Sequence, residues 1–246
     1  MKKTLVVAMV SAMFLALPAW ADVTEPMVRF LSTSPSVSLT VYHPFAPAGQ
    51  TFPVGVVNVV VDLPDGEPEF QAQAYCIDLK QTSSFSDRPY GLHPLEIAPN
   101  DGGSVYSPMG VFKANAIREL WGEHGTEVVN GTTAAAFQAA IWEIIYENSN
   151  LPPVMNAWDL NSGNLSVSDA AVAAQANAWL ASLDGQGELD QTLWALTNFT
   201  TDTTYQDLVF RLPGGDRPPV PEPLTVATVA MGLSGLGMYI RRRTIA

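Results

Sequence analysis

The sequence predicts an α+β domain in which strands at both ends of the chain enclose an inserted helical subdomain of about three helices. Valine-rich and alternating segments occupy residues 36–79, whereas the apolar period lengthens to that of a helix between residues 111 and 183. Two more strand-like segments follow this helical region. We therefore expect β-sandwich or barrel-like strands around the helices, with the apolar segments at both chain ends lying outside this domain, residues 22–212.

Alternation and valine content predict the strands. Val37, Leu39 and Val41 alternate with serine and threonine, which is the pattern of a half-buried strand. The valine-rich segment that follows is typical of one or two buried strands, and in the next segment Ala74 and Cys76 share a face. The expected strands are residues 36–45, 52–63, 70–79, 192–199 and 205–212, with a short one possible at 92–97 and a Pro-Asp-Gly-Glu-Pro turn at 64–68.

Three segments with helical periodicity predict the helices. Phe112 and Leu120 belong to one apolar stripe of the first segment. Thr132 or Thr133 can cap the second helix and Ser168 the third, since hydroxyl side chains accept hydrogen bonds from the first turn. The expected helices are residues 111–121, 132–148 and 168–183.

The first residues of the chain, 1–21, are typical of a secretory signal peptide. Lys2 and Lys3 precede an uncharged apolar run, and Ala19-Trp20-Ala21 matches the small-x-small cleavage pattern. The apolar run is short for a full membrane span, so we expect cleavage before Asp22, with an uncleaved anchor as the alternative.

The last residues, 221–246, combine three features in order. Pro221, Glu222 and Pro223 follow a Pro/Gly linker at residues 213–220. An uncharged run at residues 224–240 then reaches the lower limit of a membrane-spanning helix, about 17 residues. The run ends in an arginine cluster, which stays on the cytoplasmic side and leaves the domain outside. The cluster consists of Arg241, Arg242 and Arg243.

This order of features resembles the PEP-CTERM sorting signal of exported bacterial proteins. The resemblance implies an exosortase-type processing enzyme as a partner and an inner-membrane-anchored precursor. It further implies that the processed protein reaches the cell surface or an extracellular matrix of exopolysaccharide. An ordinary tail anchor after a proline-rich linker is the alternative.

Charge and composition limit the partners. The chain has 24 acidic and 12 basic residues, and five of the basic ones lie in the two terminal segments. An acidic domain repels phosphate backbones, so we expect no nucleic acid partner. We expect no cofactor and no metal site. Residues 184–190 place oxygens at alternate positions but lack the full calcium-loop pattern. The six tryptophans are expected in the core rather than on a sugar-binding face.

Two residues in the sequence stand out chemically. Cys76 is the only cysteine, and a lone cysteine in an exported protein is buried and inert, paired with another chain, or chemically special. Gln138 shares a helical face with Ile141 and Trp142, and a buried amide without partners costs about 1–3 kcal/mol. Gln138 is therefore hydrogen-bonded in the core or used in chemistry.

The segments around these two residues resemble a family. Tyr75-Cys76-Ile77-Asp78 on a strand, followed by Phe137-Gln138-Ala139-Ala140-Ile141-Trp142 on a helix, is similar to the two signature motifs of bacterial thioester domains. The resemblance covers about residues 70–148. It implies that the cysteine sulfur and the glutamine carbonyl join with loss of ammonia, in a water-poor pocket. The pocket would be lined by Tyr75, Ile141 and Trp142. Surface adhesins of the family usually have Thr where this chain has Phe137.

The expected function is covalent attachment of an exported protein to an amine or hydroxyl on a surface protein or polysaccharide. The reaction runs once per molecule, so the protein is not expected to be an enzyme. The alternative is a non-covalent structural or binding protein of the exopolysaccharide matrix, with the same fold and no thioester. A hydrolase is a distant third. The candidates by type for proton transfer are His43, His93, His124 and Asp78.

Overall fold

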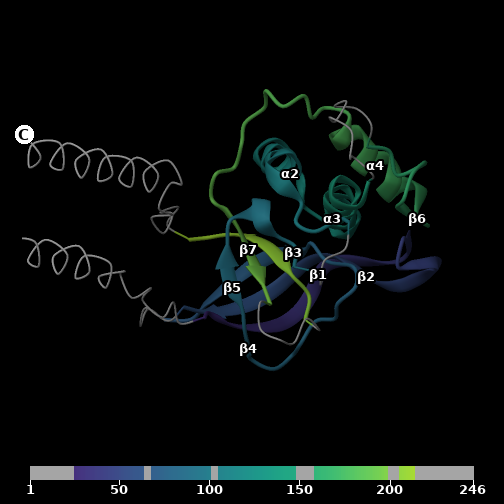
Figure 1. Ribbon diagram of the computed structural model, residues 1–246. Helices are drawn as coiled ribbons and strands as arrows, with labels where there is room; N and C mark the ends of the chain where they lie inside the picture. The colour runs from purple at the N-terminus through teal and green to yellow at the C-terminus, as the bar shows by residue number, and fades with distance from the viewer. Residues whose placement is uncertain (1–24, 64–67, 101–104, 148–157, 199–204, 214–246) are drawn as a thin grey trace, which may run out of the picture. The chain divides into compact units, whose positions relative to one another are not determined.

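The computed structural model describes residues 25–63, 68–100, 105–147, 158–198 and 205–213 (Figure 1). The described residues up to Leu212 belong to one compact unit. The expected signal peptide, most of the turn at 64–68 and the sorting segment fall outside the described residues. Within the described ranges, no helix combines the length and apolar character that crossing a membrane requires.

The strands form one antiparallel sheet, in the order β4-β1-β2-β3-β8-β7-β5, with β6 pairing with β1. The edge strands β4 and β5 are separated in the chain by Tyr90 alone, so the sheet curves back toward itself and is nearly barrel-like. The strands are β1 (Met27–His43), β2 (Ala46–Asp62), β3 (Phe70–Cys76), β4 (Arg88–Pro89), β5 (Gly91–His93), β6 (Ser166–Val167), β7 (Leu193–Thr197) and β8 (Leu208–Arg211).

The first strand is longer than the sequence predicts. β1 begins at Met27 rather than residue 36, because it pairs along its whole length with the valine-rich β2. Its first half contains serine, threonine and proline, and a register shift lies between Thr33 and Ser36. Proline and bulges obscure the alternation on which strand prediction depends.

The described part of the chain contains the three predicted α-helices, which lie together on one side of the sheet (Figure 1). They are α2 (Gly110–His124), α3 (Gly131–Tyr146) and α4 (Ala170–Leu180), with short 3-10 helices at η1 (Leu95–Ile97) and η2 (Gly125–Glu127). The strand considered at 92–97 is thus confined to β5 and continues as η1. The N-caps differ from the predicted residues and are Asn130 for α3 and Asp169 for α4, although the predicted Thr133 takes part in the capping box of α3.

The central helix is buried on all sides. Every residue of α3 from Ala134 to Tyr146 is buried, and the helix contacts the first three strands as well as α2 and α4. A helix that is apolar all round belongs in a core. Its first residue, Gly131, lies against β1 so closely that a Cβ there would be 2.6 Å from the Ser36 carbonyl oxygen. This close contact places the start of α3 directly on the β1 bulge.

A capping box begins α3, and its loss should weaken the domain. Asn130 Oδ1 accepts a hydrogen bond from the Thr133 N–H (3.0 Å), and Thr133 Oγ1 accepts one from the Asn130 N–H (3.1 Å). We expect Asn130→Ala to lower the free energy of unfolding by about 1 kcal/mol in urea denaturation. Thr132→Ala, at the neighbouring position predicted as a cap, should have little effect. Equal losses in both variants would contradict this assignment.

Candidate functional site

Cys76 is buried at the end of β3, where it pairs with Leu208 of β8. Its side chain is part of a tight turn: Sγ donates a hydrogen bond to the Asp78 carbonyl oxygen (2.9 Å) and accepts one from the Asp78 N–H (3.4 Å). Burial, together with the negative charges of Asp78 and Asp207, raises the pKa of the Cys76 thiol well above its usual value. The resting sulfur is therefore a neutral thiol.

Gln138 reaches the same residue from α3. Its Oε1 accepts a hydrogen bond from the Cys76 N–H (2.8 Å), and its Nε2 donates one to the Cys76 carbonyl oxygen (2.7 Å). We call this pair of hydrogen bonds the amide clasp. The two residues are 62 positions apart in the chain, and their exposed fractions are 3% for Cys76 and 1% for Gln138. The fold thus brings the only cysteine and the singled-out amide together in the core.

The geometry of the amide clasp would suit acyl chemistry at Gln138. A main-chain N–H directed at Oε1 polarises the amide carbonyl and would stabilise negative charge on that oxygen, as an oxyanion hole does. In thioester formation, sulfur would bond to the Gln138 side-chain carbon and the carbon–nitrogen bond would break. The thiol proton would leave with the nitrogen as ammonia. The arrangement therefore contains a nucleophile, an electrophile and a donor for the developing charge.

Trp142 lies one helical turn beyond Gln138 and is 2% exposed. Its indole lies near the Cys76 sulfur and lowers the thiol pKa, against the larger effect of burial, although its N–H does not meet the sulfur in normal hydrogen-bond geometry. The indole N–H has no hydrogen-bond acceptor among the described residues. The ring also meets Phe52 of β2 edge-on, with centroids 6.0 Å apart. Trp142 thus closes the site on the helix side.

The other two predicted pocket residues, Tyr75 and Ile141, are also buried. Ile141 has no exposed surface. Tyr75 packs its ring on Phe137 of α3 and Trp121 of α2, with centroid distances of 4.9 and 5.3 Å. Tyr75 therefore supports the packing of α2 and α3 against β3.

The structure adds two residues that sequence reasoning missed. Tyr146 Oη accepts a hydrogen bond from the Leu79 N–H (2.9 Å), and Gln206 Nε2 donates one to the Asp78 carbonyl oxygen (3.3 Å). Tyr146 lies two turns after Gln138, so helical periodicity could have indicated it. Gln206 is 128 residues from its partner, and no local pattern indicates that contact.

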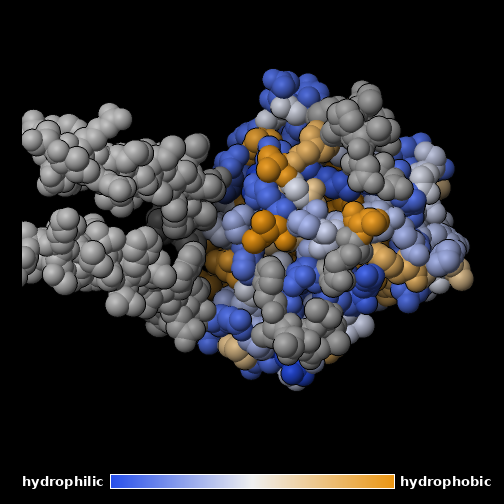
Figure 2. All heavy atoms as spheres, in the orientation of Figure 1, coloured by the Kyte–Doolittle hydropathy of each residue, from blue (hydrophilic) through white to orange (hydrophobic). Residues whose placement is uncertain are grey.

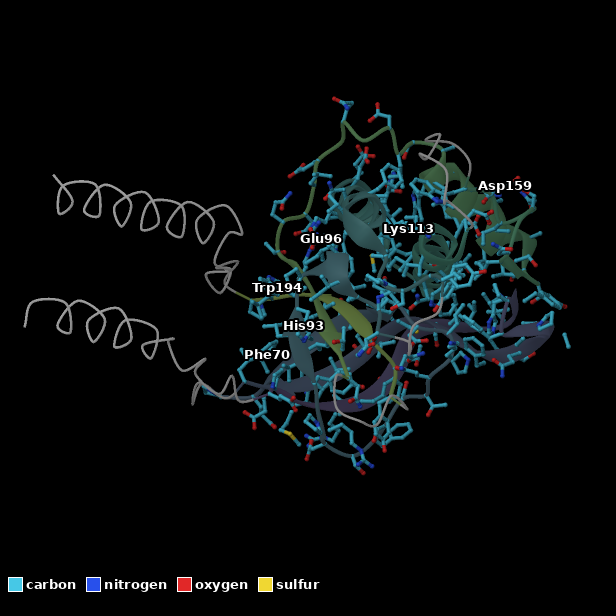
Figure 3. The ribbon with its side chains drawn as sticks, in the orientation of Figure 1. Phe70, His93, Glu96, Lys113, Asp159 and Trp194 are labelled. Carbon is cyan, nitrogen blue, oxygen red and sulfur yellow. The ribbon has the colours of Figure 1, made fainter. Side chains whose placement is uncertain are left out.

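The candidates for proton transfer occupy separate places. Asp78 contacts the sulfur directly, through its main-chain N–H and carbonyl. His43 is buried at the turn of the β1–β2 hairpin, and its Nε2 is 3.4 Å from Gln50 Oε1. His93 lies on β5 (Figure 3). The ring of His124 is close to Glu127 and to Ser182, each at 2.8 Å.

A small cavity adjoins the site. Its lining includes Gln206, which donates to the Asp78 carbonyl, and Leu208, which pairs with Cys76. The remaining lining residues are Val28, Phe30, Val59, Ser83, Ser84 and Tyr90. The Cys76 sulfur and the Gln138 amide are not among its lining residues.

Residues 184–190, considered above as a calcium loop, surround the carboxylate of Glu119 instead. Glu119 of α2 is buried, and its side chain accepts hydrogen bonds from the N–H groups of Asp184 (3.1 Å), Gly185 (2.9 Å) and Gly187 (3.0 Å). Main-chain N–H groups that point into a loop bind an anion such as this carboxylate. Across the described ranges, no three His, Cys, Asp or Glu side chains are grouped to hold a metal ion.

The described tryptophans belong to the core. Trp194 of β7, labelled in Figure 3, is 5% exposed. The others are Trp121, Trp142, Trp158 and Trp179, all buried. On the face drawn in Figure 2, hydrophobic residues form scattered patches among hydrophilic ones. These five tryptophans therefore stabilise the core of the domain.

No family model and no curated protein match the sequence. Among solved structures, the chain is similar to the N-terminal domain of the Streptococcus pyogenes pilus tip adhesin Cpa, with 16% identity over 79% of this chain and 96% of that chain (TM-score 0.41). It is also similar to the N-terminal thioester domain of a surface protein from Clostridium perfringens, with 13% identity over 76% and 98% (TM-score 0.40). A third similar structure is the N-terminal thioester domain of fibronectin-binding protein SfbI from Streptococcus pyogenes, with 17% identity over 75% and 98% (TM-score 0.37). Sequence identities and TM-scores this low carry no argument about function. Any such argument rests on the geometry of the site.

Proposed function

We propose that this protein attaches covalently to its target through an internal thioester between Cys76 and Gln138. The observation that supports the proposal is the amide clasp, in which a buried glutamine is hydrogen-bonded to both main-chain groups of the only cysteine. The clasp holds the side-chain carbonyl of Gln138 next to the residue whose sulfur would attack it.

The surroundings suit such a bond. A thioester must be kept from water until its target arrives, and the side chains of Cys76, Gln138 and Trp142 are each at most 3% exposed. An amine or hydroxyl on a surface protein or polysaccharide would then attack the Gln138 carbonyl and free the thiol. Each molecule reacts once, so the protein acts as a crosslinker rather than an enzyme.

The two ends of the chain support the place of action. A signal peptide at residues 1–21 and the PEP-CTERM-like segment at residues 221–246 would direct the protein out of the cytoplasm. We propose a membrane-anchored precursor that an exosortase-type enzyme processes, followed by display on the cell surface or in the extracellular matrix.

A second candidate function is favoured by the completeness of the amide clasp. Both polar ends of the Gln138 amide are satisfied by the main chain, as in a structural core glutamine. With that role alone, the domain would be a non-covalent binding or structural protein of the exopolysaccharide matrix.

Intact-mass measurement of the purified protein distinguishes the two functions. If the thioester forms, the wild-type protein should be lighter than its sequence mass by one ammonia, and treatment with methylamine should add one methylamine. Cys76→Ala should show its full sequence mass and take up no methylamine. A wild-type protein of full mass, whose thiol titrates on unfolding, would favour the non-covalent function.

A further inference from the structure

The indole N–H of Trp142 is a buried donor without an acceptor among the described residues. Trp142 is 2% exposed, and its Nε1 makes no hydrogen bond to any residue that the structure describes. Native proteins keep few such groups, and each one requires an explanation. A state of the site in which the neighbouring sulfur is charged would supply the acceptor.

The unpaired donor lies beside the Cys76 sulfur. Trp142 follows Gln138 by one turn, so the two side chains share a face of α3, and Gln138 is hydrogen-bonded to Cys76. The influence of Trp142 on the Cys76 thiol pKa reports the same proximity. In the resting state the thiol directs its own proton to the Asp78 carbonyl oxygen, and the indole N–H remains unpaired.

We propose that Trp142 is a catalytic residue that donates its indole N–H to the Cys76 sulfur whenever that sulfur carries negative charge. This inference rests on the proposed thioester chemistry. An uncharged sulfur, in the thiol or in the thioester, is a weak acceptor, whereas an ionised partner makes a hydrogen bond about twice as strong. The donor therefore stabilises the transition state more than the resting state, which is the requirement for catalysis.

Sulfur is transiently anionic in both directions of the chemistry. In opening, the nitrogen of an amine bonds to the Gln138 carbonyl carbon, the carbon–sulfur bond breaks, and its electron pair passes to Sγ. The surplus proton of the nitrogen then moves to the sulfur, which leaves an amide and a thiol. In formation, the sulfur bonds to the same carbon and the thiol proton departs with the amide nitrogen as ammonia. Trp142 serves both steps from one position.

Two substitutions at position 142 and one matched control test this role in the full chain. Trp142→Phe removes the N–H and replaces the two fused rings of indole with a single smaller ring. Trp142→β-(3-benzothienyl)alanine keeps the shape of the indole and removes only the N–H. Trp121→Phe removes another buried indole, on α2 next to Tyr75. The measurement is the rate of methylamine incorporation by intact mass, with urea denaturation to compare stability.

We expect both variants at position 142 to open about 10- to 100-fold more slowly than wild type, and Trp121→Phe to open at the wild-type rate. If the benzothienyl variant opens at the wild-type rate, Trp142 acts only through its shape and the inference is overturned, while the proposed function stands. If the wild-type protein carries no thioester, its own mass shows that the proposed function has failed, and the inference fails with it.

Discussion

Gln138→Met is expected to abolish methylamine uptake and to lower the free energy of unfolding by about 2–4 kcal/mol. Methionine has nearly the shape of glutamine but no acyl group, so no thioester can form. It also leaves the N–H and carbonyl of Cys76 buried without the partners that Gln138 provides. The same substitution should therefore remove the chemistry and weaken the fold.

The stability part of this prediction is best measured in a Cys76→Ala background. No thioester can form there, and the amide clasp stays intact because it involves only the main chain of residue 76. Urea denaturation then compares the free energy of unfolding of Cys76→Ala with that of the Cys76→Ala, Gln138→Met double variant. The difference is the contribution of the amide clasp alone. Methylamine uptake by Gln138→Met, or equal stability of the two background proteins, would contradict the assignment.

Glu143 should make the stability of the domain depend on pH. Its side chain is fully buried on α3, Oε1 accepts a hydrogen bond from the Asp159 N–H (3.0 Å), and Oε2 has no partner among the described residues. Burial raises the pKa of Glu143 from 4.5 to about 8, the carboxylates of Glu147 and Asp159 add to the rise, and Lys113 opposes it. Lys113 and Asp159 are labelled in Figure 3.

The sign of the effect follows from proton binding. The folded state keeps the Glu143 proton up to about pH 8, whereas the unfolded chain loses it near pH 4.5. Between these values the folded state binds more protons, so stability falls as pH rises and becomes constant above about pH 8. The total loss is on the order of 3–5 kcal/mol, at about 1.4 kcal/mol per pKa unit.

Glu143→Gln should remove this dependence. The amide has nearly the shape of the protonated acid and keeps the oxygen that accepts from Asp159 N–H. We expect stability similar to wild type near pH 5 and higher by several kcal/mol above pH 8, measured by urea denaturation across that range. Glu147→Gln, at the partly exposed C-cap one turn further on, removes only a secondary contribution to the Glu143 pKa and should keep most of the wild-type slope. An unchanged slope in Glu143→Gln would refute the prediction.

The sequence by itself determined the α+β class, the three helices and most of the strands. These are properties of short windows, in which the apolar period or the valine content is visible without the rest of the chain. It also singled out Cys76 and Gln138, since a lone cysteine and an amide on an apolar helix face are unusual wherever they lie. The same local reasoning failed at the helix caps, where Asn130 and Asp169 act in place of the predicted residues.

Only the tertiary structure decided how these two residues are held. The amide clasp joins positions 62 residues apart, and the Gln206 contact with the Asp78 carbonyl spans 128 residues. Hydrogen bonds between distant residues have no periodic signature in the sequence. The unpaired N–H of Trp142 and the unpaired oxygen of Glu143 are likewise visible only once the packing around them is known. Burial sets the chemistry of both groups, and burial is a property of the folded chain.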